Sequence, residues 1–180
     1  PGVDLDHIIP LDKGGAPYIL HPLRLMLRMD SDTARMVAVL HDVVEDHAHE
    51  GYTFDFLAAE GIPGEVIAAL RCVTKTAAEE RDSEGKYMDC VRRAATDPIA
   101  RQVKIADLED NMNLLRIAAE LSDRDLARLK RYHAAWRLLK DGAAAQHADH
   151  VGVCGPAWVR DQHFVAGVYD GLHGAVVGMD

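Results

Sequence analysis

One short stretch of the chain carries the residue types of metal-assisted chemistry. It reads HDVVED over residues 41–46, so one imidazole and three carboxylates fall within six positions. The apolar positions around it recur at helical spacing, and we expect one helix from about residue 30 to residue 46. Residues four apart on a helix share a face, so His41 would lie over Glu45, and Asp42 under Asp46. The adjacent His41-Asp42 pair would offer a nitrogen and an oxygen to one cation, with two carboxylates beside it.

The alternative interpretation of this stretch is a solvated helix face with an incidental acidic end. Four ionisable side chains are unfavourable in a helix that packs into the core, because burying each one without a partner costs several kcal/mol. The sequence therefore favours a functional site.

Two further segments offer ligands of the same kind. His21 lies in a predicted helix at 18–29, and Asp107 and Asn111 lie four apart in a helix expected to begin at Asp97-Pro98. Taken alone, a buried histidine is ordinary, and a helical aspartate is usually solvated. Combined with the 41–46 stretch, they give a mixed nitrogen and oxygen set, which favours a divalent ion such as Mn2+ over a thiolate-type zinc site.

The remaining periodicity predicts an all-α protein. Apolar stripes at helical spacing indicate further helices at 54–60, 63–75, 86–95 and 123–141. From residue 142 onward Gly and Val become frequent and the helical period fades. We therefore predict a helical domain over 1–141 and a C-terminal extension of unknown role over 142–180.

Composition limits the kind of protein. The 180 residues suit one domain with a sizeable core, and the net charge of -9 argues against a nucleic-acid or membrane-surface binder. The three cysteines are odd in number and form no C-x-x-C pair, so we expect no disulfide framework and a cytoplasmic location. No basic leader precedes an apolar segment, and no apolar run suffices to span a bilayer. We thus expect no membrane partner.

The order of these motifs resembles that of the HD-domain metal-dependent phosphohydrolases. Within that superfamily the stretches 12–23, 41–46 and 103–111 are similar to the hydrolase domain of RelA/SpoT-type alarmone enzymes, and the resemblance covers about 13–139. It is closest to their small single-domain hydrolases. The resemblance implies an HD-type helical bundle, followed here by an irregular C-terminal arm. It also implies removal of the 3′-diphosphate of guanosine 3′,5′-bis(diphosphate) as pyrophosphate.

The same resemblance implies roles for particular residues. One Mn2+ per chain would be held by His21, His41, Asp42 and Asp107. Glu45 and Asp46 would activate and orient the attacking water. The substrate would be contacted by Lys13, Arg24, Lys104, Asn111 and Tyr132, although Tyr132 could equally serve core packing.

Two other functions stay open at this point. The chain could be an HD-type phosphohydrolase for another nucleotide, such as a nucleoside phosphate or NADPH. It could also be a non-catalytic module that binds a nucleotide, but such modules generally lose their metal ligands, and all four candidates are present. The sequence leaves open whether the protein is a homo-oligomer.

Overall fold

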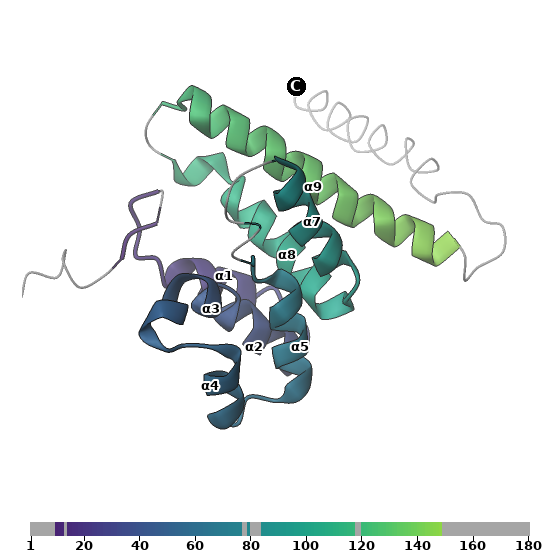
Figure 1. Ribbon diagram of the computed structural model, residues 1–180. Coiled ribbons are helices and arrows are strands. Elements are labelled where there is room, and N and C mark those ends of the chain that lie inside the picture. Colours follow the sequence, from purple (N-terminus) through teal and green to yellow (C-terminus); the bar gives the residue numbers. More distant parts are fainter. Residues whose placement is uncertain (1–9, 13, 77–78, 80–83, 118–119, 149–180) are drawn as a thin grey trace, which may run out of the picture. The chain divides into compact units, whose positions relative to one another are not determined.

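Helices make up nearly all of the secondary structure in the described part of the chain. The computed structural model describes residues 10–12, 14–76, 79, 84–117 and 120–148 (Figure 1). In chain order the elements are α1 (Leu20–Met26), α2 (Asp32–Leu40), α3 (Val43–His47), η2 (Ala48–Glu50), α4 (Phe54–Ala59), α5 (Gly64–Val73), α7 (Glu84–Ala95), α8 (Pro98–Asn111), η3 (Leu114–Arg116) and α9 (Asp123–Ala148). Over these ranges the only extended pairing is an isolated bridge between Leu11 and Pro17. The predicted all-α class is confirmed.

Helix starts follow the capping residues of the sequence. The Ser31 hydroxyl accepts a hydrogen bond from the Ala34 N–H at the start of α2, at 3.2 Å. The Asp97 carboxylate accepts one from the Ala100 N–H at 2.8 Å, and Pro98 is the first residue of α8. Such caps satisfy N–H groups that have no partner within the helix. They fix where α2 begins, after which His41 and Asp42 follow, and where α8 begins, which carries Asp107.

The main core lies between α1, α2, α5 and α8, with α2 in contact with the other three. Leu25, Val37, Leu70 and Val103 each contribute a fully buried side chain to it. Burial of such a side chain stabilises the fold by about 1.5–3 kcal/mol. This packing sets the relative positions of α1, α2 and α8, on or beside which the predicted metal ligands lie.

A second apolar cluster attaches α9 to α7 and α8. Its fully buried members include Val91 of α7, Leu108 of α8 and Leu139 of α9, and Figure 1 shows the long helix α9 running beside the other two. None of the described helices is both long enough and apolar enough to cross a lipid bilayer.

Helix α9 is longer than the predicted 123–141, because it continues through Gly142 to Ala148. Three consecutive alanines at 143–145 have the highest helix propensity of any residue and outweigh the single glycine. The chain divides into two compact units after Gly142. The predicted separate extension over 142–180 stays a prediction, since 149–180 fall outside the described residues.

Candidate metal centre

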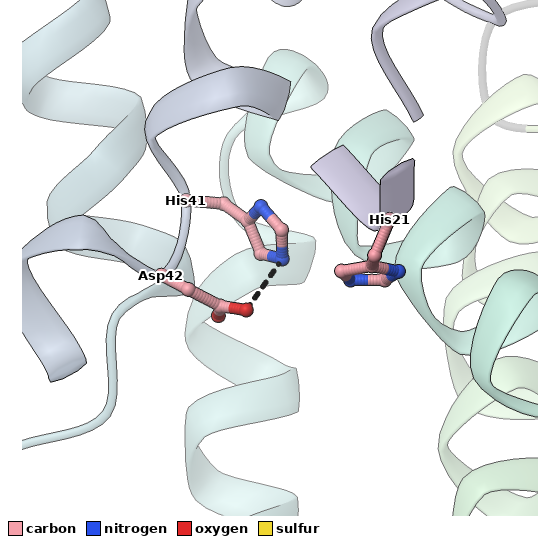
Figure 2. A group of neighbouring side chains, drawn as sticks. All are labelled: His21, His41 and Asp42. Atoms are coloured by element: carbon pink, nitrogen blue, oxygen red, sulfur yellow. Dashed lines mark ion pairs between the residues drawn. The ribbon is translucent and has the colours of Figure 1, made fainter. Parts of the chain in front are cut away.

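Two segments bring three predicted ligands together. His21 comes from α1, and His41 and Asp42 come from the junction between α2 and α3. One ligand atom from each lies within 4.8 Å of the others, and Figure 2 shows the two imidazoles on neighbouring segments with Asp42 beside His41. The ring centroids of His21 and His41 are 5.3 Å apart, in an edge-to-face arrangement. Both histidines are buried.

The helix predicted to run from 30 to 46 is interrupted at this pair. Helix α2 ends at Leu40 and α3 begins at Val43, with Asp42 as its N-cap residue. The Asp46 N–H still donates to the Asp42 carbonyl at 2.8 Å, so one helical turn is kept across the break. The Asp42 side chain does not cap α3 and contacts Tyr18 and His41 instead. The predicted ligand pair His41-Asp42 therefore lies at a helix junction.

The fourth predicted ligand, Asp107 of α8, faces both histidines. Its Oδ1 atom is 3.4 Å from His21 Nε2 and 4.0 Å from His41 Nε2. Asn111 donates to Oδ1 at 2.6 Å, and the Lys104 ammonium donates to Oδ2 at 2.8 Å. Burial alone would raise the pKa of Asp107, but the Lys104 charge and the contact with His21 hold that pKa well below its usual range. Asp107 is thus a fixed carboxylate.

The environment of the His41 Nε2 atom tests whether these residues fit a metal ion. His41 Nδ1 lies 2.8 Å from the Ala38 carbonyl, to which it donates, so the lone pair of the neutral ring is at Nε2. Nε2 is buried and has no aligned hydrogen-bond partner in the described structure, although Asp42 Oδ2 is only 3.1 Å away. A nitrogen lone pair next to carboxylate oxygens is the environment of a divalent cation. These residues therefore fit a metal ion.

The electrostatics around His41 agree with this fit. Burial alone would lower the pKa of His41, but the contact with Asp42 and the charge of Asp107 raise it to about 9. Burial also opposes ionisation of Asp42, yet the contact with His41 lowers the pKa of Asp42 to about 2. The centre stabilises positive charge, and a proton and a metal ion would compete for His41.

Tyr18 also belongs to this centre, and no role was predicted for it. Its hydroxyl donates to Asp42 Oδ2, and its ring centroid is 5.9 Å from that of His21. Burial and the charge of Asp42 raise the pKa of Tyr18, so the hydroxyl keeps its proton. The spacing from Tyr18 to His21 is one helical turn, which is the signal that the sequence offered.

The two predicted catalytic carboxylates have different surroundings. Glu45 accepts the Lys75 backbone N–H at 3.1 Å and also pairs with the Lys75 ammonium. Asp46 has no side-chain hydrogen bond or ion pair within the described structure. Burial, and then the charges of Asp42 and Glu45, raise the pKa of Asp46. The raised pKa makes Asp46 a candidate proton acceptor.

A cavity of about 460 Å³ opens beside these groups, and both Glu45 and Asp46 line it. This volume falls in the usual range of small-molecule sites. Cationic side chains line it at five positions: Lys75, Lys104, Arg116, Arg128 and Arg131. Six carboxylates line the same cavity, so an anionic ligand would meet positive charge only at particular side chains and at a bound cation.

The predicted substrate contacts fall into three groups. The cavity is lined by three of them: Lys104, Asn111 and Tyr132. Tyr132 lies beside Tyr87, with ring centroids 6.1 Å apart, so it serves both cavity and packing. Arg24 is outside the lining residues and binds Asp110 through its Nε at 2.7 Å. Lys13 lies outside the described residues.

Comparisons with known proteins give two curated relatives. The chain is 32% identical over 122 residues to a protein of Mycobacterium leprae named probable GTP pyrophosphokinase, which covers 63% of this chain and 15% of that protein. It is 32% identical over 124 residues to a guanosine-3′,5′-bis(diphosphate) 3′-pyrophosphohydrolase of Aquifex aeolicus, with 64% and 17% covered. The chain thus spans less than a fifth of the length of either relative. No family model matches the sequence. Both relatives are named for reactions of guanosine nucleotides, which agrees with the resemblance of the sequence motifs to the RelA/SpoT-type enzymes.

Proposed function

We propose that this chain hydrolyses the 3′-diphosphate of guanosine 3′,5′-bis(diphosphate), or of its 5′-triphosphate analogue. The products would be GDP or GTP and intact pyrophosphate. The observation that carries the proposal is the buried Nε2 of His41, which faces two carboxylates beside a cavity that both cationic and acidic side chains line.

One Mn2+ would be held by His21, His41, Asp42 and Asp107. Imidazole and carboxylate donors suit such an ion, and when bound it would supply Lewis acidity toward phosphate oxygens. Tyr18 and Lys104 support the set, because each donates to a carboxylate ligand and fixes its orientation. Outer contacts of this kind tune metal affinity.

The proton chemistry falls to the carboxylates on α3. Water attacks the phosphorus that is bonded to the ribose 3′-oxygen, and its proton passes to Asp46. The bond between that phosphorus and the 3′-oxygen breaks, and the 3′-oxygen takes up the proton that Asp46 received, which restores the Asp46 carboxylate. Glu45, held by Lys75, orients the water. A base whose pKa is raised toward the working pH is the more effective one, which favours Asp46 in this role.

Cationic groups on the opposite elements would neutralise the remaining phosphate charge. Arg128 and Arg131 of α9 and Arg116 after α8 line the same cavity. Guanidinium groups bind phosphate oxygens through paired hydrogen bonds. Since the interaction is electrostatic, substrate affinity should weaken as the salt concentration rises.

The names of the two relatives describe opposite reactions, so the test includes both. Purified protein with Mn2+ and guanosine 3′,5′-bis(diphosphate) should yield GDP and pyrophosphate, measured by chromatography and a pyrophosphate-specific assay. Protein with GTP and ATP should yield no tetraphosphate or pentaphosphate. The doubly substituted His41→Ala/Asp42→Ala protein is the matched control and should give no product.

A substrate panel separates the proposal from the other phosphohydrolase functions. It contains a nucleoside monophosphate, NADPH and the bis-diphosphate at equal concentration. Release of orthophosphate alone, or much faster turnover of another nucleotide, would replace the proposal with a different phosphohydrolase activity. Net synthesis of the bis-diphosphate analogue from GTP and ATP would show that the chain is a synthetase and would overturn the proposal.

A further inference from the structure

The imidazole of His21 is contacted by carboxylates of α8 at both of its nitrogens. Asp107 Oδ1 lies 3.4 Å from Nε2, and Asp110 Oδ2 lies 2.7 Å from Nδ1. Asp107 and Asp110 are one helical turn apart, so α8 reaches the two sides of one ring. All three side chains are buried, with exposed fractions of 6% for His21, 9% for Asp107 and 7% for Asp110.

The carboxylate of Asp110 is held firmly in turn. Arg24 donates to it through Nε at 2.7 Å and through a terminal nitrogen at 3.0 Å. Arg116 donates to the same carboxylate and, at 3.0 Å, to the Asp110 backbone carbonyl. Hydrogen bonds between guanidinium and carboxylate groups are strong and directional, so they fix the plane of the acceptor. Asp110 is thus a rigid acceptor at His21 Nδ1.

We propose that Asp110 is a positioning residue of the metal centre. Its carboxylate accepts the Nδ1–H of His21, which leaves the Nε2 lone pair directed at the space shared with His41 and Asp42. Histidine ligands depend on such a partner for their tautomer and ring orientation. Arg24 and Arg116 act one step further out, because they orient Asp110 and do not contact the ring. The inference rests on the proposed function only in requiring a divalent cation at His21.

The competing interpretation gives Asp110 a purely structural role as the counter-ion of two arginines. The two interpretations differ in what they predict for His21. A positioning role requires that His21 Nδ1 carries a proton and that Asp110 influences metal affinity through His21. A structural role predicts no such influence on metal affinity, although the 2.7 Å contact needs the Nδ1 proton in either case.

The first measurement is the affinity of the protein for Mn2+ in the absence of nucleotide. The electron paramagnetic resonance signal of unbound Mn2+ gives the fraction of the ion that is bound. Asp110→Asn should weaken binding by about 10–100-fold, the usual effect of losing a partner of a ligating histidine. Glu109→Gln is the matched control, because this neighbouring carboxylate binds Arg28 and Trp136 outside the centre. The control should bind as the unaltered protein does. Unchanged affinity in Asp110→Asn would overturn the proposal.

The second measurement repeats the comparison in a His21→Ala background. There, Asp110→Asn should cost little further affinity, because the ring that it positions is gone. An equal loss in both backgrounds would assign Asp110 a structural role. Melting curves identify a variant that does not fold, and Asp110→Ala then takes its place.

The third measurement needs no variant. Nitrogen-15 NMR of the metal-free protein should show a proton on Nδ1 of His21, and its absence would overturn the proposal. Because no nucleotide is present in any of the three, a result for Asp110 stands even if the bis-diphosphate is not hydrolysed.

Discussion

Lys75 holds the carboxylate of Glu45 twice, through its side-chain ammonium and through its backbone N–H at 3.1 Å. Side chains of both residues are largely buried, with exposed fractions of 30% for Lys75 and 16% for Glu45. The neighbouring Asp46 lines the same cavity without such a partner in the described structure. The two adjacent carboxylates therefore differ in their partners, because Lys75 fixes Glu45 and no described side chain fixes Asp46.

This difference predicts unequal effects of two isosteric substitutions. Asp46→Asn should keep Mn2+ and lower kcat by about 10²–10⁴-fold, the range for removal of a general base. Glu45→Gln should lower kcat less, because the Lys75 charge already neutralises this carboxylate. Steady-state kinetics on metal-loaded proteins provide the comparison. Equal losses of kcat would indicate that both residues contribute to proton transfer. A larger loss of kcat in Glu45→Gln would indicate that Glu45 is the general base and Asp46 orients the water.

Removal of the lysine tests the same pair through stability. Lys75→Met should leave the Glu45 carboxylate without its main partner and destabilise the fold by about 1–3 kcal/mol, the cost of an unsatisfied buried group. Urea denaturation gives the free energy of unfolding. Lys130→Met on the exposed surface of α9 is the control and should stay within about 0.5 kcal/mol. A Lys75 variant as stable as this control would show that the pair is energetically unimportant.

Metal stoichiometry tests the ligand set directly. The double variant His41→Ala/Asp42→Ala should lose stoichiometric Mn2+, because it removes two of the clustered ligand atoms. His49→Ala is a matched control, since its imidazole is 74% exposed and pairs only with Glu50 among described residues. Elemental analysis after gel filtration measures bound metal. Full occupancy of the double variant would disprove the assignment.

A separate ion pair should make stability depend on acid pH. The hydrogen bond from Arg93 is the main cause that lowers the pKa of Glu79 to about 2, below the ordinary 4.5. A depressed carboxyl pKa stabilises the fold above the unfolded-state pKa, and this contribution is lost as pH falls from about 4.5 toward 2. The melting temperature of Glu79→Gln should thus lie below that of the unaltered protein at pH 7, and the gap should close near pH 2.

The exposed pair of Asp89 and Arg92 provides the control for that experiment. It lies at the surface of α7, where ion pairs contribute about 0–1 kcal/mol. Asp89→Asn should therefore change the melting temperature little at any pH. A gap for Glu79→Gln that stays constant from pH 7 to pH 2 would contradict the linkage.

The loop before α1 makes a close approach that only glycine permits. A Cβ atom at Gly14 would lie 2.5 Å from the Arg116 carbonyl oxygen, which is backbone and cannot move aside easily. Gly14→Ala should displace the loop, lower the melting temperature and reduce affinity for the anionic substrate. Gly64→Ala is the control, because its Cβ would meet nothing within 4 Å in α5. That change should be neutral or stabilising, by up to about 1 kcal/mol. Equal melting temperatures of the two variants would contradict the close approach.

The ligand cluster could be predicted because its members have few other uses in a core. A buried imidazole next to a carboxylate at 41–42 is costly without a cation, and the structure brings His21 to the same place. The helical class was equally accessible, since the apolar stripes and the caps at Ser31 and Asp97 are local signals. The ligand pair at 41–42 and the helices could be predicted because both depend on residues that are close together in the sequence.

The partners of those groups could not be predicted, because they come from distant parts of the chain. Lys75 reaches Glu45 from 30 residues away, and Asp110 reaches His21 from 89 residues away. The break between α2 and α3 was also missed, since an uninterrupted period in the sequence hides a cap within it. Arg24 was expected to contact the substrate, yet its guanidinium binds Asp110, and no local pattern reveals that.

The contact between Asp12 and Arg116 makes opening of the loop before α1 measurable by hydrogen exchange. One Asp12 oxygen accepts the amides of Gly14 and Ala16, at 2.8 and 3.1 Å, while the other pairs with Arg116 from 104 residues along the chain. These two amides exchange with solvent only when their hydrogen bonds to the Asp12 side chain break. Their hydrogen-exchange rates therefore report how often the loop opens. Arg116 also binds Asp110, the partner of His21, so a change that stabilises the contact between Asp110 and His21 should slow the exchange of both amides.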